Sequence, residues 1–229
     1  ERYYVAATMA LDGSSKFGED AKEGVKLGNY AFGAFPSVEG AWVMTNERWW
    51  KPNKWVNYLK LNGGFDLVGN DDVNSVASRT YFVSRRMLNA LTGISMGNIG
   101  NTHLQWETTA RFTVGAQGSF FDNRLWLSFN YFNANTYNLL SMGELSYISG
   151  LETNWLNDGR VRNQGIDVSA NVKLLSVKDW TWSVSASLGH YQNRVKRLPG
   201  GRESMVTELY GANVMNRVGS ATGQFYGYK

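Results

Sequence analysis

Residues 108–132 alternate between apolar and polar side chains over two runs that meet at the pair Asp122-Asn123. From Ala110 to Phe120 every second residue is apolar or glycine, and between them lie Arg111 and Gln117 among threonine, glycine and serine. A repeat of two residues is that of a β-strand, whose side chains point to opposite faces. The pattern is typical of a soluble sheet with one face in a core, and equally of a membrane wall around a wet interior.

The same alternation recurs and predicts eight strands. They are expected at residues 2–11, 38–45, 59–67, 104–120, 124–137, 166–174, 180–188 and 224–229. The chain has 25 glycines but only 3 prolines, and 14% of its residues are aromatic, which favours strands and turns over helices. The predicted fold class is therefore all-β, with an antiparallel up-and-down arrangement.

Short and long connections alternate between these strands. The short ones are residues 46–54, 122–123 and 176–179, and the long ones are residues 12–34, 68–103, 138–159 and 192–221. An up-and-down meander places alternate connections at opposite ends, as in outer-membrane barrels with short periplasmic turns and long extracellular loops. No window of 18 apolar residues exists, which excludes a transmembrane helix.

Strand length and aromatic placement favour the membrane interpretation. The runs at 104–120 and 124–137 are longer than the roughly 9 to 11 residues that cross a bilayer. Aromatic residues collect near the short connections, as in an interfacial girdle: Trp49, Trp50, Trp55, Phe120, Phe121, Trp126, Trp180 and Trp182. The alternative is that these rings close the ends of a soluble sandwich.

Seven segments, in this order and spacing, resemble one known family. They are DGSSKFG (12–18), FPSVEGAWV (35–43), WVNYLKL (55–61) followed by Gly69-Asn70, LQWETT (104–109), FFDNRL (120–125), GRVRNQGIDVS (159–169) and FYGYK (225–229). Together they resemble the SusC/RagA family of TonB-dependent outer-membrane transporters of the Bacteroidota. The resemblance implies that residues 1–229 are a middle-to-late segment of a barrel of about 22 strands, without its plug and its closing C-terminal strands. Residues 68–101 depart from the family pattern.

The resemblance also implies a function. It implies import of an oligosaccharide or a peptide across the outer membrane, with a SusD-like surface lipoprotein, and with TonB contacting an N-terminal region outside this chain. Three alternatives stay open at this point: a complete eight-stranded barrel, a barrel that serves as a non-transport scaffold, and a soluble carbohydrate-binding β-sandwich.

Two groups of residues are candidates for contact with ligand, plug or water. The connection 138–159 combines aromatic and planar polar side chains that suit a sugar or a peptide: Tyr147, Trp155, Asn157 and Asp158. A second group lies on the polar side of the alternation and is expected to face a lumen, whereas the apolar side faces lipid: Lys60, Asp66, Arg111, Gln117, Asp167 and Lys173.

Signals for catalysis, metals and nucleic acid are weak. His103 and His190 lie on different segments without ligand spacing, and the chain has no cysteine. Asp71-Asp72 lacks the rest of a calcium loop. The net charge is only +4, and the basic residues are scattered rather than gathered into a stripe. We therefore predict no enzyme activity, no cofactor, no metal site and no nucleic-acid partner.

Overall fold

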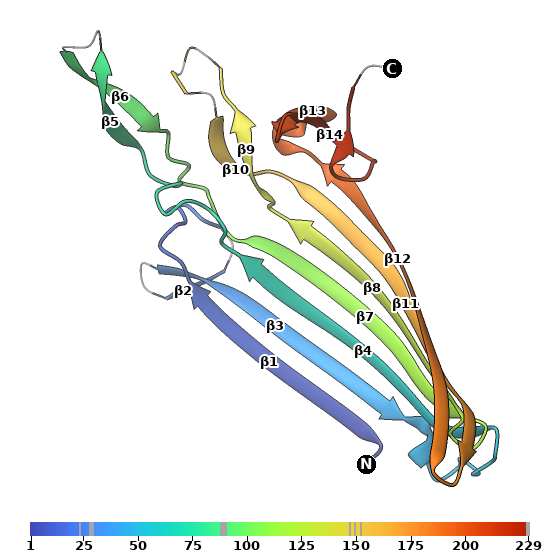
Figure 1. The fold of residues 1–229 in the computed structure, drawn as a ribbon. Helices are drawn as coiled ribbons and strands as arrows, with labels where there is room; N and C mark the ends of the chain where they lie inside the picture. The colour runs from blue at the N-terminus through green and yellow to red at the C-terminus, as the bar shows by residue number, and fades with distance from the viewer. Residues whose placement is uncertain are drawn as a thin grey trace.

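Seven long antiparallel strands form one curved sheet (Figure 1). The computed structural model describes residues 1–22, 24–27, 30–87, 91–146, 148, 150–151 and 153–227. The strands, in sheet order, are β1 (Tyr3–Gly13), β3 (Tyr30–Val43), β4 (Val56–Asn70), β7 (Glu107–Phe120), β8 (Leu125–Tyr137), β11 (Arg160–Val177) and β12 (Trp180–Arg197). A short strand, β2 (Val25–Leu27), pairs with β3. The prediction of an all-β up-and-down meander is confirmed.

The connections sort to opposite ends of the sheet as predicted. At one end lie the short connections, including the 3-10 turn η1 (Met44–Asn46). At the other end lie hairpins β5 (Tyr81–Met87) with β6 (Leu91–Asn98), β9 (Leu140–Glu144) with β10 (Thr153–Asn157), and β13 (Ser204–Leu209) with β14 (Ala212–Arg217) (Figure 1). A second 3-10 turn, η3 (Pro199–Gly201), follows β12. We call this second end the long-loop end.

Several strands extend further toward the long-loop end than predicted. β3 begins at residue 30 rather than 38, β11 begins at 160 rather than 166, and β12 ends at 197 rather than 188. In the added part of β11 and β12 polar side chains occur on both faces, as at the neighbours Asn163 and Gln164, and only Val161 and Val195 are aliphatic. The backbone ladder continues there, but the alternation that reveals a strand in the sequence has ended.

The eighth predicted strand, at residues 224–229, is not part of the main sheet in the described residues. Only β15 (Gln224–Phe225) is strand, and it pairs with β14. Backbone N–H of Tyr226 donates to the Asn213 carbonyl at 2.9 Å, which holds this segment against the loop hairpin instead. Residues 228 and 229 lie outside the described part. β1 and β12 are the unpaired edges of the sheet, so these residues do not form a closed eight-stranded barrel.

One face of the sheet is an exposed apolar surface. Its central row crosses all seven strands with each residue directly opposite the next: Tyr3, Trp42, Leu61, Ala116, Phe129, Val168 and Leu188. Parallel rows on either side contain Val5, Met9, Phe65, Phe112, Val114, Ile166 and Val184, and together these rows form the apolar band. Leu188 is 74% exposed and Val5 is 79% exposed. The long strands lie in one sheet, not in two packed sheets, which contradicts the soluble sandwich.

The edge of the apolar band runs obliquely to the strands. At the short-turn end, the band begins at Tyr3 on β1 and at Trp180 on β12. The residue of β12 in the same cross-strand row as Tyr3 is Leu188, which is eight residues after Trp180. A shift of eight residues of about 3.3 Å over six spacings of about 4.8 Å corresponds to strands tilted by about 40°. Strands of outer-membrane barrels tilt by roughly 35–45°.

The turn between β7 and β8 is held in a left-handed conformation. Phe121, Asp122 and Asn123 have φ of 56°, 55° and 62°. Ser119 Oγ donates to Asn123 Oδ1, and Asn57 Oδ1 accepts from the Asn123 backbone N–H at 3.0 Å. Asparagine tolerates the left-handed region better than most residues, which explains its place in this turn.

Glu47 fastens the first short connection to the edge of the sheet. Its carboxylate accepts hydrogen bonds from the Tyr3 hydroxyl and, at 3.0 Å, from the Trp42 indole, and Arg2 lies 3.7 Å away. The hydrogen bond from Tyr3, followed by that from Trp42, lowers the pKa of Glu47 below its ordinary value. Trp42 also packs edge-on against Trp49, so this turn gathers the interfacial aromatics that the sequence predicted.

We predict that Asn123→Ala lowers the free energy of unfolding by about 1–2 kcal/mol, because alanine is strained at this φ and loses the Ser119 contact. The measurement is the urea midpoint of the full-length protein in detergent. Asn123→Gly loses the same contact without the strain and is expected to unfold at higher urea than the alanine variant. Equal urea midpoints for the two variants would contradict the claim that the left-handed φ of residue 123 strains an alanine side chain.

Candidate functional site

The six polar residues predicted to face a lumen share the face opposite the apolar band. They are Lys60, Asp66, Arg111, Gln117, Asp167 and Lys173, and the cross-strand register places them on the polar side of their strands. Lys60 lies directly opposite Gln117, and Asp66 lies directly opposite Arg111. Arg111 Nε is 3.0 Å from Asp66 Oδ1. The alternation in the sequence therefore brings these side chains to one surface.

This polar face is hollowed. A hollow of about 750 Å³ is lined by Asp66, Arg111 and Asp167 together with Asn62 and Asn130. A neighbouring hollow of about 470 Å³ is lined by Lys60 and Gln117 and shares Asn62. The two hollows give the sheet a polar, concave surface behind its apolar band.

Two acceptor atoms on the polar face have no partner among the described residues. They are Oδ2 of Asp66 and Oδ1 of Asn62, and both are buried. Leaving a buried acceptor, above all a carboxylate oxygen, without a donor costs free energy. Water or further polypeptide on this side of the sheet would supply the missing donors.

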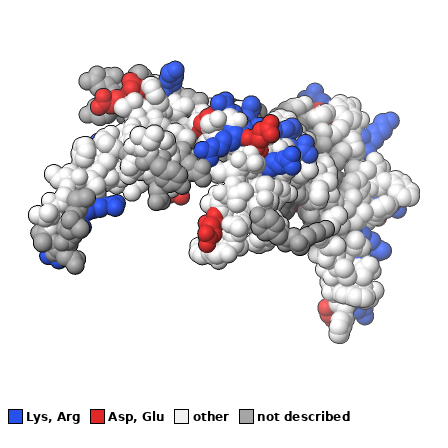
Figure 2. Space-filling model, turned by 90° about the horizontal axis from the view of Figure 1, so that it is seen from above, with Lys and Arg blue, Asp and Glu red and all other residues white. Residues whose placement is uncertain are grey.

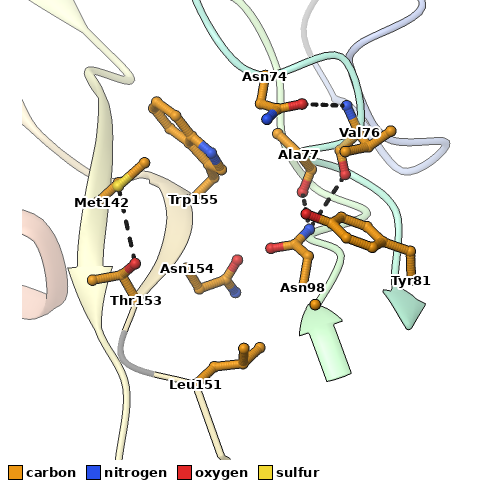
Figure 3. A pocket seen from close by; sticks show the side chains of 11 residues that line it. Asn74, Val76, Ala77, Tyr81, Asn98, Met142, Leu151, Thr153, Asn154 and Trp155 are labelled. Atoms are coloured by element: carbon orange, nitrogen blue, oxygen red, sulfur yellow. Dashed lines mark hydrogen bonds between the residues drawn. The ribbon is translucent and has the colours of Figure 1, made fainter. Parts of the chain in front are cut away.

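A pocket of about 220 Å³ lies between the bases of the hairpins β5–β6 and β9–β10, and we call it the loop-end pocket (Figure 3). Its lining comes from two connections far apart in sequence: Asn74, Val76, Ala77, Tyr81, Gly97, Asn98, Met142, Leu151, Thr153, Asn154 and Trp155. One indole, one phenol and several amides surround a small apolar floor. Such a mixture suits ligands with both flat apolar surfaces and hydrogen-bonding groups.

Asn98 organises one wall of the loop-end pocket. Its Nδ2 donates to the carbonyls of Val76, Ala77 and Arg79, at 3.3, 3.3 and 2.8 Å. Across the pocket the side chain of Asn154 extends from β10 into the space that Asn98 faces (Figure 3). Asn154 Oδ1 is buried and has no hydrogen-bond partner in the described part of the chain. The pocket thus combines a rigid wall with an available acceptor.

Of the predicted loop residues, Trp155 lines the loop-end pocket, whereas Asn157 forms hydrogen bonds within the chain beside it. Trp155 lines the loop-end pocket and packs against the small core of Val73, Ala77 and the fully buried Leu104. Asn157 accepts from the Gln105 backbone N–H at 2.7 Å and donates to the carbonyls of Gln105 and Asn138, both at 2.8 Å.

Asp158 is also engaged within the chain. It lies 2.8 Å from Arg197 and accepts from the Gly200 backbone N–H at 3.0 Å. Asn157 and Asp158 also line a separate hollow of about 380 Å³ with His103 and Lys22. Tyr147 lies outside the described residues.

Sequence reasoning missed Tyr81, Asn98 and Asn154 as pocket residues. Tyr81 and Asn98 belong to one long connection and Asn154 to another, so only the folding of both hairpins brings them together. The one available signal was the frequency of asparagine in both connections.

The described residues contain no group of three His, Cys, Asp or Glu side chains placed to hold a metal ion. Within the same residues, no helix has the length and apolar character needed to cross a membrane.

Comparison with known proteins decides the family. A family profile described as "TonB dependent receptor-like, beta-barrel" matches residues 50–228. The chain belongs to this family. Its members are receptors and transporters of the outer membrane rather than enzymes. The resemblance read from the seven sequence segments is thus confirmed.

Curated relatives are much longer than this chain. A TonB-dependent receptor of Formosa agariphila is 29% identical over 236 residues, which cover 100% of this chain and 23% of the relative. The TonB-dependent receptor SusC of Bacteroides thetaiotaomicron is 25% identical over 245 residues, which cover 100% of this chain and 24% of the relative. The chain therefore spans about a quarter of the length of these relatives.

Solved structures show the same fold. A chain in the structure of the RagAB peptide importer in its closed-closed state superposes with a TM-score of 0.82 over 97% of this chain and 23% of that chain, at 23% identity. The open-open state of the same importer gives a TM-score of 0.81 over 96% of this chain and 23% of that chain, also at 23% identity. The sheet described above is thus folded as a segment of such a barrel.

We predict that Asn98→Ala loosens the wall of the loop-end pocket, because three backbone carbonyls lose their shared donor. Amide hydrogen exchange in residues 76–80 of the full-length protein is expected to become about tenfold faster. Ser84→Ala, an exposed change on the same hairpin, serves as the matched control and should leave exchange unchanged. Equal exchange in Asn98→Ala and wild type would contradict the role given to Asn98.

Proposed function

We propose that the protein containing this chain imports a nutrient oligomer, either an oligosaccharide or a peptide, across the outer membrane. Membership of the TonB-dependent receptor-like family, together with a sheet that has an exposed apolar band on one face and polar hollows on the other, carries this proposal. Residues 1–229 serve as part of the barrel wall. Energy comes through TonB, which contacts a part of the protein outside this chain.

The polar face of the sheet supports a filled, wet lumen. Asp66, Arg111 and Asp167 line the larger hollow, and the unpartnered oxygens of Asp66 and Asn62 point to donors that lie beyond this chain. In the proposed assembly, plug residues and water supply those donors. Polar contacts that can exchange between protein and water allow a plug to rearrange without leaving charges buried and unpaired.

The long-loop end supports recognition of an oligomer. The loop-end pocket offers Trp155 as a flat surface, with the acceptor of Asn154 and the phenol of Tyr81 beside it. Aromatic rings flanked by amides bind sugar faces and peptide groups alike. We place the first contact with the oligomer here, and a SusD-like lipoprotein covers this end while the ligand is held.

Uptake by cells is measured with two fluorescent mixtures, one of oligosaccharides and one of peptides. We predict that deleting the gene abolishes uptake of one of the two mixtures. Wild-type protein restores this uptake, and a proton uncoupler stops it, because TonB draws on the proton gradient of the inner membrane. Asn154→Ala is expected to lower the initial rate about five- to tenfold through loss of one ligand hydrogen bond.

Thr207→Ala removes an exposed hydroxyl on β13, away from the loop-end pocket, and is the matched control. Both variants are compared at equal amounts in the outer membrane. Uptake that persists after deletion, or that continues in the presence of the uncoupler, would contradict energised import by this protein.

A further inference from the structure

The apolar band ends at Tyr131 on β8, at Ile166 on β11 and, in keeping with its oblique edge, at Leu188 on β12. Tyr131 of β8, Ile166 of β11 and His190 of β12 lie directly opposite one another. Two residues further toward the long-loop end, the same face has a row of amides: Asn133, Gln164 and Gln192. Two residues beyond that row lie Asn135, Arg162 and Arg194. The change from apolar to polar side chains is therefore abrupt on this face.

The polar surface above the band is positively charged. Basic and acidic side chains gather around the middle of the long-loop end in the view from above (Figure 2). On the face of the apolar band, however, the described residues of β7, β8, β11 and β12 beyond its upper edge include no acidic residue. They include four arginines. Arg197, directly opposite Arg160, is paired with Asp158, and we call the other three, Arg160, Arg162 and Arg194, the arginine patch.

The arginines of the patch form no ion pair among the described residues. Arg162 Nε donates to Asn133 Oδ1 at 3.2 Å, and Arg160 lies 4.2 Å from the centre of the Tyr137 ring. Arg194 is exposed. Asp158, the acid nearest in sequence to Arg160 and Arg162, is engaged by Arg197 at 2.8 Å. The three charges are therefore open to a partner from outside the chain.

The register brings two like charges together. Arg162 and Arg194 are directly opposite each other in the β11–β12 pair. Like charges in directly opposite positions destabilise a sheet, and an anion placed between two guanidinium groups removes the repulsion. A phosphate accepts from two arginines with several oxygens at once, which fits this pair better than a single carboxylate.

The backbone of the arginine patch lies just beyond the layer of lipid headgroups, within reach of its own side chains. Arg162 lies four residues beyond Ile166, or about 13 Å along the strand, which becomes about 10 Å along the membrane normal at a tilt of about 40°. The polar layer on each side of a bilayer is roughly 5–8 Å thick. Long arginine side chains can bend toward the apolar edge and place their charge within this layer.

We propose that Arg160, Arg162 and Arg194 bind the phosphate of a lipid headgroup in the leaflet on the long-loop side. The inference rests on the proposed placement of this sheet in the outer membrane, but not on the transported substrate. The lipid chains would lie along the apolar band below the patch, while the amides of Gln164 and Gln192 bind the sugar or glycerol part of the headgroup. The patch thereby anchors the barrel wall at a fixed height.

The test uses the full-length protein in nanodiscs of an uncharged, phosphate-free glycolipid with a small share of lipid A, supplied in phosphorylated or dephosphorylated form. Native mass spectrometry counts the lipid A molecules retained by the protein. Wild type should retain the phosphorylated form at least about tenfold more than the dephosphorylated one. Arg162→Gln combined with Arg194→Gln should abolish this difference, whereas Arg86→Gln on the β5–β6 hairpin should preserve it.

Three outcomes would overturn the proposal. Equal retention of phosphorylated lipid A by wild type and the double variant would show that the patch does not bind it. Complete displacement of the lipid by inorganic phosphate would show a site for free anions instead. Loss of a co-purifying lipoprotein from the double variant, with unchanged lipid retention, would assign the patch to a protein partner. Uptake measured in parallel separates these results from failure of the import proposal, because the double variant should transport within about twofold of wild type.

Discussion

The hydrogen-bonded ladder between neighbouring strands is the constraint on which the rest of this structure depends. Because the ladder keeps seven strands in register, apolar side chains that are spread over 186 positions of sequence, from Tyr3 to Leu188, form one continuous row. A slip of one residue in any pair would move a whole strand's apolar set to the polar face. The exposed band makes lipid the natural solvent of this face, and its oblique edge agrees with strands that cross a bilayer at a tilt.

In the proposed importer, the two faces and the two ends of the sheet have different tasks. The apolar band would meet lipid in that protein, while Asp66, Arg111 and their neighbours would provide a polar surface for a plug and water. The short turns, with Glu47 and the left-handed Asn123, close one end tightly. The long connections fold into hairpins that enclose the loop-end pocket at the other end. The proposed sites of ligand recognition, lipid anchoring and passage therefore occupy separate surfaces of one wall.

Much of the fold could be predicted from sequence, because the long strands carry apolar side chains on one face and polar side chains on the other, which produces a strict alternation. That is why the polar face with Lys60 and Lys173 and the opposite apolar row were found. The ends of β11 and β12 were not found, because both faces carry polar side chains at Asn163, Gln164 and Arg194 and the alternation disappears. The segment at 224–229 was predicted as a strand of the main sheet, but its residues Gln224 and Phe225 pair with β14, since short-range patterns do not specify partners. The loop-end pocket could not be predicted because Asn98 and Asn154 meet only after two hairpins have folded.

The most direct test of the central claim is a spin-label scan of residues 125–132 on β8 in the full-length protein, reconstituted in lipid vesicles. Collision rates are measured with oxygen, which concentrates in the bilayer, and with a water-soluble nickel chelate. We predict that oxygen accessibility peaks at Leu125, Leu127, Phe129 and Tyr131, and that nickel accessibility peaks at the positions between them. Uniform accessibility along the strand, or peaks in the opposite phase, would contradict a wall with lipid on its apolar face and a wet lumen on the other.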